Sequence, residues 1–349
     1  MDNKVNQVSR KEILPAFLGT VIGVSVLLAV MQFAQNTLLS GNAYINGFVE
    51  FFTGAIEGNI GNRIEWILAD MTEAAFLACP LASVFMIIGT LIAYVLEKNG
   101  SPSKGTGVSG LSPIFLPLFV SSLLAVVIGT LCFGSYFSYG WIPTFAAFLS
   151  VNAFVCYYGT DLKKIITIIL FSVIATFYLN LWILTKVISP LGLPLFISVS
   201  ITIFLIVPIG TWIFKLLPWM KNEPAPAPEG GEAPAKAPAP PAPGKWFITQ
   251  VFGDIGSLMV WGSSMAVMFM FVGAILAWIL NPLNPDYSTG TFPILLFAQI
   301  AAAALSIFIY YPVWKRDGMA LTFAAVVIVS AILTTYPCNP VIVGLTILF

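Results

Sequence analysis

The chain of 349 residues contains no histidine and few charged side chains. Charged residues make up 9% of it, whereas an average soluble domain carries about 25%. The 15 basic and 15 acidic residues balance, so we expect no basic face for nucleic acid. The absence of histidine removes the commonest general base and the commonest metal ligand.

Recognisable catalytic motifs are also missing. The four cysteines are too far apart to form a C-x-x-C pair, and we expect them to be buried small hydrophobic residues. The sequence has no nucleotide-binding P-loop, no H-E-x-x-H zinc motif and no G-x-S-x-G nucleophile motif. We therefore expect a protein that is not an enzyme and that uses no cofactor or metal.

What the chain has in abundance is apolar sequence, at 58% hydrophobic residues. A membrane-spanning helix needs about 20 apolar residues. Such runs predict an all-α integral membrane protein with about nine or ten transmembrane helices, in contact with the lipid bilayer. The expected spans are Ile13–Asn36, Ile67–Leu96, Leu111–Phe133, Trp141–Tyr158, Ile165–Ile188, Leu193–Leu217, Ile248–Leu280, Phe292–Trp314 and Met319–Tyr336, followed by a short run at Val341–Phe349.

A segment rich in proline and alanine divides the chain. Proline fixes φ and lacks an amide donor, so residues 221–246 are predicted to be an extended linker. The predicted organisation is an N-terminal helix with an amphipathic connector at 1–64, a first membrane repeat at 65–220, this linker, and a second, shorter repeat at 247–349.

The two membrane segments resemble each other. At a constant offset of 184 residues (254 − 70), seven positions are identical, and at an offset of 178 a Thr-Phe-Ala-Ala block recurs. Such internal duplication is typical of transporter folds. The identical pairs are Asp70/Asp254, Ala82/Ala266, Phe85/Phe269, Met86/Met270, Gly89/Gly273, Ala93/Ala277 and Leu96/Leu280.

The distribution of lysine and arginine predicts the orientation. With the N-terminus and the linker in the cytoplasm, only Arg63 and Lys186 of the 15 basic residues fall outside. Spans that match between the two copies are then five helices apart. Because five is an odd number, matching spans cross the membrane in opposite directions, and the second copy has inverted topology. The expected location is the cell membrane.

The second copy ends at Phe349, which aligns with Phe171 inside the fifth span. Two interpretations remain open. The last run is a half-helix buried in protein, or a partner subunit, a second copy of the chain or further sequence completes it. We favour the second.

Acidic residues near predicted spans are candidate ion-binding or gate residues, because charge inside a membrane is costly. They are Asp70, Glu73 and Asp254. An alternative is that Asp70 and Asp254 cap helices, since Asp70 and Glu73 have the spacing of a capping box. An unbroken helix of about 40 Å from Asp70 to Leu96 would place Asp70 at the outer interface, which favours capping. A break of this helix at Pro80 would bring Asp70 and Glu73 deeper and keeps the ion-binding or gate role open.

Uncharged polar residues inside the spans are candidates for lining a solute path. Asn152 aligns with Ser330 in the two short spans that carry the best-matched sequence, and Thr144 aligns with Thr322. Gln299 is a further candidate. The alternative for each is a packing role between helices.

We therefore expect a membrane transporter, or permease, that moves a small neutral or polar solute or a monovalent cation between two inverted repeats. The alternative is a non-catalytic membrane subunit of a larger transport complex.

Overall fold

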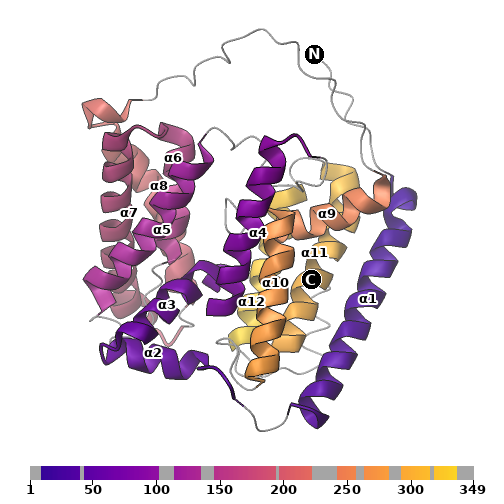
Figure 1. Ribbon diagram of the computed structural model, residues 1–349. Coiled ribbons are helices and arrows are strands. Elements are labelled where there is room, and N and C mark those ends of the chain that lie inside the picture. The colour runs from indigo at the N-terminus through magenta and orange to yellow at the C-terminus, as the bar shows by residue number, and fades with distance from the viewer. Residues whose placement is uncertain are drawn as a thin grey trace, which may run out of the picture. The chain divides into compact units, whose positions relative to one another are not determined.

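The computed structural model describes residues 9–39, 43–101, 114–134, 145–193, 196–221, 242–256, 263–282, 292–314 and 318–335. All regular elements within these ranges are helices (Figure 1). They form two units: Met1–Val49, Ala75–Ser109 and Ala239–Phe349 make up unit 1, while Glu50–Ala74 and Gly110–Pro238 make up unit 2. The chain passes from unit 2 to unit 1 between Ala74 and Ala75.

Unit 1 contains the antiparallel pair α4 and α10; α9 packs on α10 and also contacts α1, α11 and α12 (Figure 1). Helix α1 packs on α11 and α9, and its Arg10 donates to the Ile309 carbonyl over 2.9 Å. The helices are α1 (Arg10–Thr37), α4 (Pro80–Lys98), α9 (Pro243–Gly256), α10 (Ser264–Leu280), α11 (Phe292–Trp314) and α12 (Gly318–Thr335).

Unit 2 is built around α6, which contacts α3, α5, α7 and α8. Helix α7 continues through a π-helical turn, η2. The elements are α2 (Phe48–Ile56), α3 (Ile60–Glu73), α5 (Phe115–Phe133), α6 (Phe145–Tyr158), α7 (Leu162–Ile183), η2 (Leu184–Ile188), α8 (Phe196–Phe214) and the 3₁₀ turn η3 (Pro218–Met220).

The helices have the length and apolar surface of an integral membrane protein. Six of those described are long and apolar enough to cross a bilayer. Large hydrophobic side chains cover their outer faces, among them Ile22 and Phe33 on α1 and Phe204 on α8. A soluble protein would not leave such continuous apolar surface in water, and a bilayer removes that cost.

Two predicted spans are interrupted, and the expectation of continuous helices at these positions was wrong. The span at Ile67–Leu96 divides into α3 and α4, with non-helical residues 74–79 between them. The span at Ile248–Leu280 divides into α9 and α10. Proline explains the first break, because Pro80 at the start of α4 has no amide hydrogen for a helical bond to residue 76.

The other predicted spans coincide with α1, α5, α6, α7, α8, α11 and α12 to within a few residues at each end. Most of the proline-rich linker (222–241) and the run at Val341–Phe349 lie outside the described residues, so both remain predictions.

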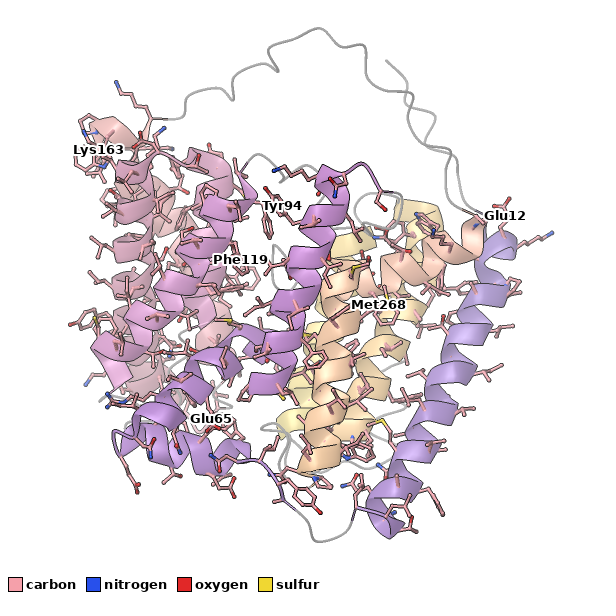
Figure 2. All side chains as sticks on the ribbon, in the orientation of Figure 1. Glu12, Glu65, Tyr94, Phe119, Lys163 and Met268 are labelled. Atoms are coloured by element: carbon pink, nitrogen blue, oxygen red, sulfur yellow. The ribbon has the colours of Figure 1, made fainter. Side chains whose placement is uncertain are left out.

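The pairing of α4 with α10 is reciprocal. A Cβ added at Gly89 would lie 2.8 Å from Phe269 Cβ and 3.0 Å from Ala266 Cα, and one added at Gly273 would lie 2.8 Å from Phe85 Cβ and 2.9 Å from Ala82 Cα. Each contact therefore maps onto the other at the offset of 184 residues. Residues later in α4 contact residues earlier in α10, so the two helices are antiparallel. Figure 2 accordingly shows Tyr94, near the end of α4, and Met268, near the start of α10, toward the same end of the pair.

Candidate functional site

The break between α3 and α4 is the most unusual backbone of the described chain. Five of its six residues are buried, and Phe76 (φ 60°) and Ala78 (φ 44°) have left-handed backbone conformations that side chains disfavour. Buried residues outside a helix leave polar backbone groups that need partners. The Ala75 carbonyl finds one in Gln299 of α11, whose Nε2 donates to it over 2.7 Å.

Gln299 joins this break to α12. Its side chain is fully buried, and Nε2 also donates to Ser330 Oγ over 3.0 Å. A carbonyl can only accept, so the Ala75 carbonyl fixes which end of the Gln299 amide faces it. The other end, Oε1, has no hydrogen-bond partner among the described residues. Gln299 thus presents a buried acceptor that a ligand or a water molecule can use.

A second polar contact joins α11 and α12, which run antiparallel, further along the two helices. Thr322 Oγ1 donates to Ser306 Oγ over 3.1 Å, and both side chains are buried. Ser306 is seven residues after Gln299, and Thr322 is eight before Ser330. The two contacts are therefore successive rungs between α11 and α12, about 10 Å apart.

The contact between Ser306 and Thr322 continues to Asp254, whose side chain also hydrogen-bonds with Thr322. Gln250, one turn earlier in α9, donates through Nε2 to Asp254 Oδ1 and to the Tyr311 hydroxyl, the latter over 2.6 Å. Neutral groups of α9 and α12 thus contact Asp254, and Gln250 links it to Tyr311 of α11. Sequence reasoning identified Asp254 and Thr322 but missed Gln250, Ser306 and Tyr311, although Gln250 lies at the i, i+4 spacing from Asp254 that brings side chains together.

Asp70 and Glu73 lie in the last turn of α3, in unit 2, and are buried. Their side chains lie within hydrogen-bonding range of each other. The expectation that Asp70 caps a helix was wrong, because Asn59 occupies the N-cap of α3 and accepts from the Asn62 amide. Asp254 likewise lies at the end of α9 and not at its start. Depth calculated from an unbroken helix does not apply to either residue.

The remaining candidates are divided between the units. The structure brings Gln299 and Ser330 into contact and places Thr322 about two turns away on α12, whereas Asn152 lies on α6 of unit 2. Thr144 lies outside the described residues. The Asn152 amide is fully buried, and neither its Oδ1 nor its Nδ2 has a hydrogen-bond partner among the described residues.

Within the described ranges, no three His, Cys, Asp or Glu side chains gather as metal ligands. The buried polar groups are mostly neutral amides and hydroxyls, which bind small polar ligands by hydrogen bonds.

The fold defines an all-helical integral membrane protein. No protein-family model, curated protein or solved structure matches the chain.

Proposed function

We propose that the protein is a membrane permease in which two inverted repeats form a path for a small neutral or polar solute or a monovalent cation. The observation that carries this proposal is the reciprocal contact of α4 with α10. Gly89 meets Phe269 and Ala266, as Gly273 meets Phe85 and Ala82. Two antiparallel segments that exchange equivalent contacts are what an approximate two-fold axis in the membrane plane would produce.

The interrupted helices support the same proposal. Transporters of inverted-repeat design bind solutes where spanning helices are broken near the middle of the bilayer. Helix α4 begins at Pro80 and α10 begins at Ser264, positions that differ by the repeat offset of 184 residues. The break before α4 is buried and contacts Gln299, a candidate for the solute path.

In this proposal Gln299, Ser330, Thr322, Thr144 and Asn152 contact the solute, and the buried carboxyls act in cation binding or gating. Asp254 and the pair Asp70 and Glu73 are the candidates for that role. The N-terminus and the linker at 221–246 face the cytoplasm, the membrane is the cell membrane, and the protein performs no catalysis and needs no cofactor.

Solute flux into vesicles tests the proposal. We expect vesicles that contain the purified chain to take up at least one solute from a panel of glycerol, xylitol, urea, Na⁺ and K⁺ faster than empty vesicles. Gly89→Ala and Gly273→Ala should each slow this flux, because a methyl group at either position forces α4 and α10 apart. Gly23→Ala in α1, where a Cβ meets nothing within 4 Å, is the matched control and should leave the flux unchanged.

Flux equal to that of empty vesicles for every solute of the panel would contradict a permease that acts alone. Recovery of the chain in stoichiometric complex with another membrane protein would then favour the alternative of a non-catalytic subunit.

A further inference from the structure

Buried hydroxyl groups in the helices of unit 2 fall into two sets. The first set donates to the backbone of its own helix, which is the ordinary way for a membrane helix to satisfy serine and threonine. Ser121 donates to the Leu118 carbonyl over 3.0 Å, Ser122 donates to the same carbonyl over 2.9 Å, and Ser150 donates to the Ala147 carbonyl over 3.1 Å. These residues need no ligand.

The second set does not bond in this way. The hydroxyls of Thr130 on α5 and of Ser172 and Thr176 on α7 have no hydrogen-bond partner among the described residues. The same is true of both ends of the Asn152 amide on α6, and of Nδ2 of Asn180, whose Oδ1 accepts from Thr202 over 3.2 Å. All five side chains are at most 2% exposed. Buried polar atoms in this state indicate a bound polar molecule or ordered water.

These five residues belong to three helices that contact one another. On α7, Ser172, Thr176 and Asn180 are spaced by four residues and therefore share one face. The short connection between α6 and α7 makes them antiparallel, and the Phe154 and Phe171 rings, 5.8 Å apart, fix their register. Asn152, two residues from Phe154, consequently lies level with the neighbourhood of Ser172.

Helix α5 is held in register with α7 by a second aromatic contact. The Phe133 and Phe177 rings stack with centroids 3.9 Å apart. Thr130 lies one turn before Phe133, and Thr176 directly precedes Phe177. Thr130 and Asn152 therefore lie at the level of Ser172 and Thr176, and all four side chains are buried in unit 2.

The mixture of donors and acceptors restricts the ligand class. A cation would be bound by acceptors alone, but Asn152 and Asn180 both present NH₂ groups, which only donate. An anion would be bound by donors alone, but Asn152 Oδ1 only accepts. Hydroxyl groups of a solute both donate and accept, and so match every group in the set.

From this geometry we infer that the α5–α6–α7 core of unit 2 binds a small neutral solute carrying several hydroxyl groups, such as a polyol. The inference rests on the proposed permease function and names its substrate class. Asn152 is the central contact, because both ends of its amide are available and α6 lies at the centre of the unit.

Comparison of Asn152→Leu with Ser150→Ala tests the inference. Leucine has the same branched skeleton as asparagine, with methyl groups in place of the amide oxygen and nitrogen, so it removes the hydrogen bonds to the solute and also removes a buried amide without partners. We expect xylitol flux to fall about tenfold or more, the equivalent of one or two hydrogen bonds, while thermal stability in detergent stays equal or rises. Ser150→Ala removes a buried hydroxyl of the same helix that bonds to its own backbone, and should leave xylitol flux unchanged.

A binding measurement makes the test independent of transport. Xylitol and mannitol should raise the unfolding temperature of the wild-type protein in detergent in a concentration-dependent manner, and should raise that of Asn152→Leu less. NaCl at the same osmolarity is the control.

Two results would overturn the inference. One is xylitol flux that Asn152→Leu leaves intact. The other is flux of Na⁺ or K⁺, or of water alone, without polyol flux or a polyol-dependent shift in stability. The second result would retain a permease and reject only its proposed substrate class, whereas the absence of all flux would reject the permease itself.

Discussion

At Phe76 and Ala78 the backbone has a conformation that costs an L-residue free energy, and both residues lie in the break between α3 and α4. A left-handed conformation disfavours a side chain by about 1–2 kcal/mol. Such strain persists only where surrounding contacts impose it, and the Gln299 bond to Ala75 is one such contact. Strain of this kind is common where a ligand is bound or a segment moves.

Replacement of Ala78 by glycine tests for this strain. We expect Ala78→Gly to be at least as stable as the wild type, because the relief of strain offsets the larger entropy of glycine in the unfolded chain. Ala74→Gly is the control, since Ala74 at the end of α3 has φ −58°, and it should lose about 0.5–1 kcal/mol. Thermal unfolding in detergent compares the two, and equal losses would argue against strain at Ala78.

Loss of the Gln299 amide should be costly. In Gln299→Met the Ala75 carbonyl loses its donor, and we expect a decrease in stability of about 1–3 kcal/mol. Gln35→Met in α1 is the matched control. Gln35 is half-buried and donates to the Pro282 carbonyl over 3.4 Å, a long bond whose loss should cost less. If both variants unfold at the same temperature, Gln299 does not hold the break.

At the scale of elements, the pair α4 and α10 depends on small residues. Each helix presents small buried residues to the other: Ala82, Gly89 and Ala93 on α4, and Ala266, Gly273 and Ala277 on α10. Their spacings of seven and four residues place them on one face of each helix. Apolar surface alone drives little association between helices in lipid, so close backbone approach at small residues supplies the contact energy. This explains why residues that are identical at the offset of 184 concentrate at this interface.

A methyl group at either glycine should therefore destabilise the protein to a similar extent. Gly89→Ala brings a Cβ to 3.0 Å from the Met265 carbonyl oxygen, and Gly273→Ala brings one to 2.7 Å from the Leu81 carbonyl oxygen. We expect each to lose about 1–3 kcal/mol, as in overpacked cores. Gly23→Ala should gain up to about 1 kcal/mol because alanine favours the helix and meets no atom.

The measurement is thermal unfolding of the three variants in the same detergent. A large loss in Gly89→Ala with none in Gly273→Ala would contradict the reciprocal contact.

At the scale of the whole molecule, inverted topology predicts which loops share a side of the membrane. The residues after α4 and the proline-rich linker should face the cytoplasm, whereas the loop after α10 should face outward. In a cysteine-free background, Asn99→Cys and Lys221→Cys should react with an impermeant thiol reagent only from the cytoplasmic side. Ser288→Cys should react only from the outside.

Labelling of intact cells and of inverted membrane vesicles distinguishes the two sides. If Asn99→Cys and Ser288→Cys are labelled from the same side, the repeats are not inverted and the proposed permease loses its main support. Lys221→Cys controls for leaky membranes, because it should match Asn99→Cys in either case.

The sequence by itself determined the class of protein and most of the helices. An apolar run long enough to cross a bilayer must form a helix to satisfy its backbone, so composition and run length were sufficient for α1, α5, α7, α8 and α11.

Only the tertiary structure decided where the long helices break and which polar groups meet. Hydropathy is insensitive to a short buried break, because residues 74–79 are as apolar as the helices around them, and so Asp70 was assigned to a helix start. The partners of Tyr311 and the Ala75 carbonyl lie 61 and 224 residues away in the chain. A hydrogen bond forms only when its two atoms are placed to within a few tenths of an ångström of about 2.9 Å, and packing rather than local sequence fixes that placement.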